Sequence, residues 1–124
     1  MNEIKEYTEK IFDVIKHIDE NDNEYWLARE LQHVLDYSQW RRFESVIDKA
    51  KITCKNSDLN VNEHFANVGK LSKRSNNAIV EITDYKLSRY ACYLIAQNGD
   101  SRKKVIALAK TYFAIQTRTI RKRI

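Results

Sequence analysis

Apolar residues recur at helical spacing in two blocks near the carboxyl end of the chain, separated by a short polar turn. The first block has Leu87, Ala91, Leu94 and Ile95, and the second has Val105, Leu108, Ala109, Tyr112, Phe113 and Ile115. Tyr90 and Tyr93 widen the first stripe, so we expect that helix to be buried on more than one side. The pattern predicts an αα-hairpin with helices at about 84–97 and 101–119.

The turn between these blocks has the residues that end one helix and start another. Asn98 and Gly99 can both take the left-handed conformation that closes a helix, and we expect a positive φ at Gly99. Asp100 or Ser101 can cap the following helix. Asp84 is likewise expected to cap a helix rather than to act in acid–base chemistry.

A narrow apolar seam predicts a third long helix at about 39–54. Its residues are Trp40, Phe43, Ile47, Ala50 and Cys54, with Arg41, Arg42, Ser45, Lys49 and Lys55 on the solvent side. A short helix at 28–35 precedes it, followed by the turn Asp36-Tyr37-Ser38, in which Ser38 is a good N-cap. We expect the helices at 39–54, 84–97 and 101–119 to share one core.

The first 27 residues allow two interpretations. Ile4, Tyr7, Ile11, Phe12, Ile15 and Ile18 keep helical spacing and predict a helix at about 3–18. Alternatively, the polar stretch 19–23 joins strands at 14–18 and 24–27 in a β-hairpin. The pattern alone leaves both open.

Between residues 55 and 83 the periodicity fades, which predicts a long connection that is functional or partly mobile. Residues 78–82 can form a short strand. We therefore predict a single, mainly α domain over 1–124, with the αα-hairpin and at most a small β-hairpin or short strands; an α+β fold is the alternative. The absence of proline and the presence of only two glycines favour helix.

Three segments resemble the DNA-damage-inducible protein D family. They are the LSRYACYLIAQNGD run at Leu87–Asp100, the YFAIQTR run at Tyr112–Arg118, and the aromatic-rich pattern from Glu24 to Cys54. Asp36 stands where members of that family often have glycine. Typical members continue beyond QTR into a second region, so the resemblance identifies a truncated member, with a family-like core at 24–119 and a basic tail at 120–124.

That family shares its amino-terminal half with the Bro-type modules of phage antirepressors and baculovirus repeat proteins. The resemblance implies a bacterial role in the DNA-damage (SOS) response. It further implies contact with DNA, single-stranded or filament-coated, or with the recombinase filament on it.

Charge is polarised along the chain, whose net charge is +5. Residues 101–124 contain eight basic and no acidic residues, whereas residues 1–36 contain ten acidic and four basic ones. A basic run of this kind is typical of polyanion binding. A solvated helix face is the plainer interpretation, and pairing of the two ends, within one molecule or in a homo-oligomer, is a third.

The short helix, turn and long helix have the outline of a helix-turn-helix that would place Arg41 and Arg42 at a DNA groove. An ordinary αα-corner has the same outline. The predicted nucleic-acid contacts are Arg41, Arg42, Lys73, Arg74, Arg102, Lys103, Lys104, Arg118, Arg121, Lys122 and Arg123. Tyr25, Trp26, Tyr37, Trp40, Tyr112 and Phe113 could stack on bases, although most lie on core stripes.

No catalytic, cofactor or metal constellation is recognisable in the sequence. His17, His33 and His64 have no ligand-like spacing, and His64 is expected to cap or pack. Cys54 and Cys92 lie on apolar stripes and are expected to be reduced core thiols. No apolar run approaches the ~20 residues that cross a bilayer, and we expect a cytoplasmic protein. Two function classes remain: a DNA- or recombinase-associated damage-response regulator, and an antirepressor-like module that binds a protein partner.

Overall fold

The computed structural model describes residues 10–122, with side chains placed as far as residue 114. Residues 10–14 are helical. The elements that follow are β1 (His17–Ile18), β2 (Glu24–Leu27), α2 (Ala28–Val34), α3 (Trp40–Asn56), α4 (Val61–His64), β3 (Phe65–Asn67), β4 (Lys70–Lys73), β5 (Ile79–Ile82), β6 (Tyr85–Leu87), α5 (Arg89–Gln97) and α6 (Lys104–Lys122).

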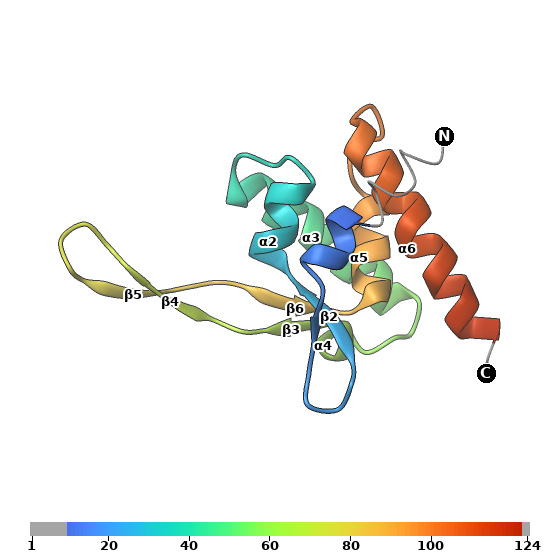
Figure 1. The fold of residues 1–124 in the computed structure, drawn as a ribbon, viewed down its shortest axis with the longest axis horizontal. Coiled ribbons are helices and arrows are strands. Elements are labelled where there is room, and N and C mark those ends of the chain that lie inside the picture. The colour runs from blue at the N-terminus through green and yellow to red at the C-terminus, as the bar shows by residue number, and fades with distance from the viewer. Residues whose placement is uncertain (1–9, 123–124) are drawn as a thin grey trace.

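The described strands form two antiparallel sheets, one of four strands in the order β1-β2-β6-β3 and one of two strands, β4-β5. The prediction of a mainly α domain is therefore wrong, and the fold is α+β. Helices α2, α3, α5 and α6 lie above the strands of the larger sheet in the view of Figure 1. The sheet was missed because its strands are only two to four residues long, too short to give a clear period of two.

The chain from β3 to β6 forms one continuous two-stranded ribbon, in which β3 pairs with β6 and β4 pairs with β5 in a single register. Phe65 lies opposite Leu87 and Lys73 lies opposite Ile79, with each step along one strand matched by one step back along the other. At the joint between the sheets, Val68 N donates to Asp84 O at 2.9 Å. The distal part of the ribbon projects from the body of the molecule (Figure 1). We call residues 69–82 the arm.

The arm ends in a three-residue loop at 75–77. Asn77 N donates to Arg74 O at 2.9 Å, and Arg74 N donates to Ala78 O at 2.8 Å. Asn77 has φ 65°, which asparagine tolerates better than most residues. In place of the long connection predicted for 55–83, the structure has the end of α3, then α4, β3 and the arm. The predicted strand near 78–82 is confirmed as β5.

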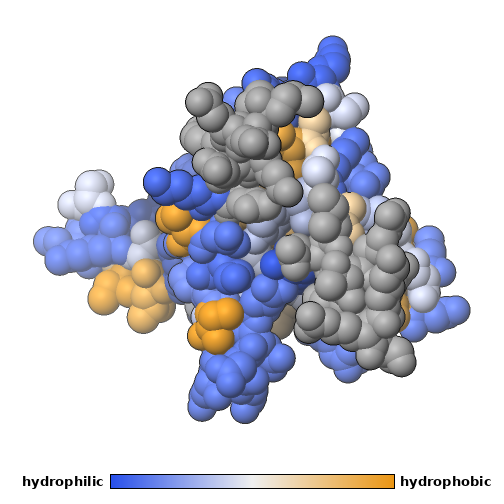
Figure 2. Space-filling view, turned by 45° about the vertical axis from the view of Figure 1, so that its right-hand side comes forward, coloured by the Kyte–Doolittle hydropathy of each residue, from blue (hydrophilic) through white to orange (hydrophobic). Residues whose placement is uncertain are grey.

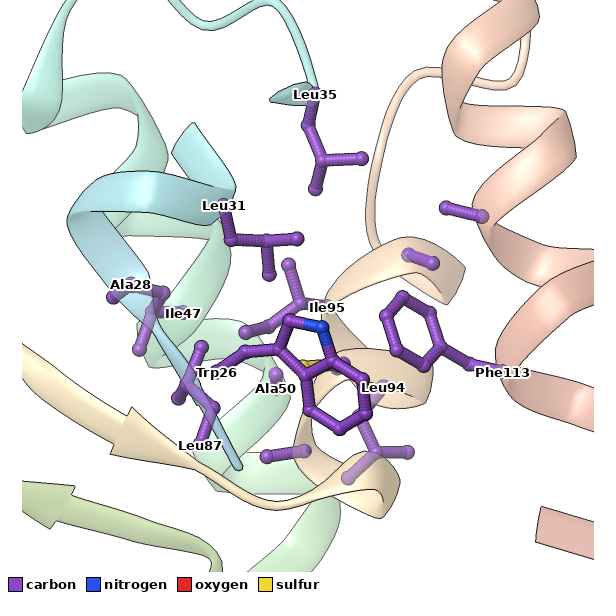
Figure 3. Close-up of a cluster of buried hydrophobic side chains, with 14 of the residues drawn as sticks. Trp26, Ala28, Leu31, Leu35, Ile47, Ala50, Leu87, Leu94, Ile95 and Phe113 are labelled. Carbon is purple, nitrogen blue, oxygen red and sulfur yellow. The ribbon is translucent and has the colours of Figure 1, made fainter. Parts of the chain in front are cut away.

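Trp26, on β2, lies at the centre of the hydrophobic core. It is fully buried, and its Nε1 donates to Phe12 O at 3.0 Å. Figure 3 shows Ile95 and Phe113 beside its indole, and the Phe113 ring meets it edge-on at 5.2 Å. Helices α3, α5 and α6 all contribute buried side chains, so the prediction that three helices share one core is confirmed. Cys54 and Cys92 are buried and unpaired.

The described part of the amino-terminal segment combines the two interpretations, a helix followed by a β-hairpin. The helix ends at Val14, and residues 17–18 pair with β2. Asp19 stabilises the turn between them, because its Oδ1 accepts from both Asn21 N and Asn23 N at 2.9 Å. The first strand is shorter than the predicted 14–18, and residues 3–9 of the predicted helix lie outside the described residues.

The αα-hairpin forms with different bounds and a different turn from those predicted. Residues 85–87 are strand β6, and α5 begins after Ser88, whose Oγ accepts from Ala91 N at 3.0 Å. Helix α6 begins at Lys104 rather than at 101. Gly99 has no positive φ, so that prediction is wrong. The close approach of Ile106 favours glycine there, because a Cβ would lie 2.9 Å from Ile106 Cδ1 and one of the two would have to shift.

The turn between α2 and α3 also differs in its capping. Ser38 does not cap α3; Gln39 occupies the N-cap position, without a side-chain hydrogen bond. Asp36 has φ 63°, a conformation in which glycine is unstrained. Gln32 Nε2 donates to Tyr37 O at 2.9 Å and closes the turn. Among the described residues, no helix is long and apolar enough to cross a membrane.

Candidate nucleic-acid interface

The arm has two faces, fixed by its register. Leu71 lies opposite Glu81 and Lys73 lies opposite Ile79, which places these four side chains on one face. Leu71 is 74% exposed and Ile79 is 68% exposed. No residue from 69 to 82 is buried. The arm therefore contributes no side chain to the core.

Basic residues outnumber acidic ones on the arm. Lys70, Lys73 and Arg74 are exposed, whereas Glu81 is the arm's one acidic residue. Figure 2 shows the arm at the left of the view, with hydrophobic residues gathered on its lower side and hydrophilic residues above. The structure thus places Lys73 and Arg74, two of the predicted contacts, at the end of a projecting ribbon. It adds Lys70, which the sequence reasoning did not select.

Asp84 fixes the root of the arm to helix α2. Its side chain is 2% exposed, and its Oδ1 accepts from Arg29 N at 3.0 Å and from Tyr85 N at 2.9 Å. The N-cap residue of α2 is Leu27, which has no side-chain acceptor, so Asp84 supplies the cap from a distant segment. Asp84 thus has the capping role that was expected of it, but on α2 rather than on the helix predicted at 84–97, whose N-cap is Ser88.

A second set of contacts joins the root to the first turn of α3. Arg29 Nε donates to Thr83 O at 2.8 Å, and the Arg29 guanidinium lies 3.8 Å from the Trp40 ring centroid. Trp40 in turn stacks with Tyr85 at 6.4 Å. Arg41 and Arg42 follow Trp40 directly and are exposed. Helix α3 therefore presents these arginines from a turn that is held against the arm's root.

Two of the three predicted contact residues at 102–104 already form hydrogen bonds within the chain. Arg102 forms a two-pronged hydrogen bond with Asp100, at 3.0 Å for each contact, which lowers the pKa of that carboxyl. Lys103 Nζ donates to Asp36 O at 2.9 Å and lies 4.4 Å from the Tyr37 ring centroid. Lys103 thus joins the α5–α6 turn to the α2–α3 turn. Lys104 is exposed.

The remaining predicted contacts lie at the carboxyl end. Arg118, Arg121 and Lys122 belong to the last turns of α6, and Arg123 lies outside the described residues. A role for these four residues in binding stays a prediction.

The acidic first third of the chain is used in contacts within the molecule. Lys86 Nζ lies 3.4 Å from Asp19 Oδ2, and Arg89 binds Glu24 through two hydrogen bonds of 2.5 and 2.9 Å. In the part of the chain that the structure describes, the long-range ion pairs of the acidic third are thus with Lys86 and Arg89. The proposed pairing with the 101–124 run is not seen there.

Arg89 was not selected from the sequence, and its role is structural. It is 7% exposed, and its guanidinium lies 5.0 Å from the ring centroids of both Trp26 and Tyr112. Burial favours the neutral form, but hydrogen bonds with Glu24 and Tyr112 outweigh it and raise the pKa of Arg89. Glu24 is 65 residues away in the sequence, so no local signal could have revealed the pair.

His64 packs, one of the two roles that the sequence indicated, and it contacts the N-cap residue of α5. Its Nδ1 lies 2.7 Å from Ser88 Oγ, and its ring meets Tyr90 edge-on at 5.2 Å. Because Ser88 Oγ accepts from Ala91 N, its own O–H is available to donate to Nδ1 of the neutral imidazole. Burial lowers the pKa of His64. Within residues 10–122, no cluster of three or more His, Cys, Asp or Glu side chains is arranged to hold a metal ion.

The aromatic residues considered for base stacking are buried or packed against other side chains. Trp26, Tyr112 and Phe113 are buried. Trp40 is covered by Arg29 and Tyr85, and Tyr25 stacks on His17 at 5.2 Å. The described residues therefore offer no row of open rings of the kind that single-strand binders use.

Comparison with known proteins identifies the family. The model of the BRO family, N-terminal domain, matches residues 14–114. The chain belongs to this family. The match includes the arm, α3 and α5, and it ends before Arg118. DNA damage-inducible protein D of Escherichia coli (strain K12) is 48% identical over 107 residues, which are 86% of this chain and 39% of that protein.

The resemblance first seen in the sequence is thus confirmed, and the chain spans about two-fifths of that relative's length. No solved structure matches the chain.

Proposed function

We propose that this chain is a non-catalytic, DNA-associated regulatory module of the DNA-damage response, which contacts duplex DNA through the arm and the first turn of α3. The 48% identity to DNA damage-inducible protein D of Escherichia coli supports the damage-response setting. The observation that supports DNA contact is the projecting arm, with three exposed basic residues and no buried side chain.

The dimensions of the arm suit a DNA groove. A two-stranded ribbon is narrow enough to enter one, and ribbon proteins use either groove. From Tyr85 at the root to Asn76 at the tip, extended strands span about 30 Å, close to the ~34 Å of one helical turn of B-DNA. Arg41 and Arg42 at the root and Lys73 and Arg74 near the tip can then reach phosphates about one turn apart.

Duplex DNA is favoured over single strands because the aromatic side chains are already packed. A single-strand binder needs open rings on which successive bases stack. Here Trp40 lies between Arg29 and Tyr85, and Tyr37 is covered by Lys103. The proposal accordingly replaces the single-stranded partner expected from the sequence by a duplex, and expects little base preference, since lysines mainly contact phosphate.

A protein partner is the second candidate. A recombinase or a repressor could bind the exposed Leu71 and Ile79, because apolar residues at a protein interface are normally exposed in the free molecule. Such an interface would depend weakly on salt, whereas phosphate binding falls steeply with it. Salt dependence therefore separates the two candidates.

The test is fluorescence anisotropy with a labelled duplex over a series of salt concentrations. Lys73→Gln with Arg74→Gln removes two charges from the arm, and Lys49→Gln with Lys55→Gln removes two exposed charges from α3 as a matched control. If the arm contacts phosphates, the arm variant should bind more weakly and lose about two units of log–log salt slope. The control should keep the slope of the wild type.

Two results would contradict the proposal. One is the absence of binding to any duplex at low salt. The other is an equal loss in the two variants, which would show that only the net charge of the chain matters.

A further inference from the structure

We propose that Leu71 and Ile79 form an apolar wedge that enters between base pairs of duplex DNA, from the minor groove, and bends the duplex. This inference rests on the proposed function and adds a mode of binding to it. It concerns the two most exposed large apolar residues of the arm, at 74% and 68%.

The fold brings these two side chains together. They lie on one face of the ribbon, on neighbouring strands, two pairs apart in the register. Such diagonal neighbours are roughly 7–8 Å apart and within reach of each other. Other exposed apolar residues, such as Val14 and Ile52, lie singly on separate helices, where they need no explanation. Among the residues whose side chains the structure describes, only the arm pair combines shared orientation with projection away from the core.

The surrounding charges favour a polyanion as the occupant. Lys73 lies on the same face as the pair, directly opposite Ile79, and Glu81 lies on that face directly opposite Leu71. Lys70 and Arg74 project from the other face, so the arm as a whole carries three basic residues and one acidic one. A wedge between two base pairs has phosphates on both sides, within reach of such side chains. Proteins that bind the minor groove commonly combine inserted apolar side chains with basic contacts and kink the duplex by 20–90°.

The wedge does not serve the stability of the free protein. Residues 69–82 include no buried side chain, so replacing Leu71 and Ile79 with serine should leave the thermal unfolding of the chain unchanged. The variant is therefore suited to a test of function, because a loss of binding cannot be attributed to unfolding if the melting curves coincide.

The experiment measures bending and binding on the same duplex. A 30-base-pair duplex labelled at both ends reports its end-to-end distance by resonance energy transfer, and anisotropy reports affinity across salt concentrations. Binding of the wild-type protein should bend the duplex and so shorten its end-to-end distance. Leu71→Ser with Ile79→Ser should leave the duplex straight, weaken binding about tenfold, and keep the salt slope, since the basic residues remain. Val14→Ser with Ile52→Ser, two equally exposed apolar residues, should bend the duplex as wild type does.

The outcomes separate the wedge from the proposed function. If wild type binds with the expected salt slope but the duplex stays straight, the wedge is wrong and DNA association stands. If wild type does not bind, the proposed function fails, and the wedge with it. If the free protein self-associates, in light scattering, through Leu71 and Ile79, the pair is a contact between copies and the wedge is overturned.

Discussion

Asp84 should be the most sensitive position at the root of the arm. Its buried carboxylate accepts hydrogen bonds from Arg29 N and Tyr85 N, and these bonds join α2 to β6. Asp84→Ala removes both acceptors and leaves two donors without a partner. A hydrogen bond to a charged group contributes roughly 1.5–3 kcal/mol, so we expect a loss of about 3 kcal/mol in the free energy of unfolding. In a domain of this size that is a fall in Tm of roughly 12 °C or more.

Asp84→Asn provides the informative comparison. Its amide oxygen can occupy the position of Oδ1 and accept both hydrogen bonds, so we expect a loss of about 1 kcal/mol, which reflects the weaker neutral acceptor. Asp48→Ala is the control, because Asp48 is exposed on α3; its effect should stay within about 0.5 kcal/mol.

Urea unfolding followed by tryptophan fluorescence measures all three variants, since Trp26 is in the core and Trp40 stacks at the root. The m-value should not change. An Asp84→Ala variant that unfolds at the wild-type urea concentration would refute the capping role. Equal losses for alanine and asparagine would show that charge, rather than the position of the acceptor, is what matters.

Three further predictions concern the body of the molecule. Gly99→Ala should lower the free energy of unfolding by about 1–3 kcal/mol, because the added methyl group overpacks against Ile106. The loss should be smaller in an Ile106→Val background. Additive losses of the two substitutions in urea unfolding would contradict close packing as the cause. Burial holds the pKa of His64 below the usual value of about 6.5 for histidine, so its contribution to stability should be full above that pH and should decline as the pH falls. An imidazole NMR titration midpoint above 6.5 would be incompatible with this. Burial and the hydrogen bond to Asp13 raise the pKa of Tyr112 to about 12. Ultraviolet titration should therefore show one tyrosine ionising near that pH, and Tyr112→Phe should abolish this step. The free energy of unfolding should fall as the pH rises above 10, because the unfolded state loses this proton first.

The helices of the core could be predicted from the sequence because each buries a stripe that repeats locally. The seam of α3 from Trp40 to Cys54 is an example, since four of its five positions are fully buried. The arm could not be predicted as readily, because four-residue strands without buried side chains give almost no periodic signal. The alternation in residues 70–73 and the Asn76-Asn77 turn were the available clues.

Contacts between distant segments were also beyond the reach of local patterns. Asp84 caps a helix that begins more than 50 residues earlier, as the 55-residue separation from Arg29 shows. Gly99 illustrates a different difficulty. Glycine was expected there for its backbone freedom, whereas in the structure the absence of a Cβ leaves room for the side chain of Ile106. The basic residues at 102–104 resembled a solvent-facing run, and only the structure reveals that Lys103 holds Asp36.

Amide NMR of the wild-type chain, titrated with a short duplex at low salt, tests DNA contact most directly. We expect the largest shifts in the arm, around Lys70, Lys73 and Arg74, and in the first turn of α3 at Arg41 and Arg42, with the buried face of α5 unaffected. Raising the salt concentration should reverse them. If the amides of the arm stay in place while the DNA is bound elsewhere, or no amide moves at all, the arm is not a DNA-binding element.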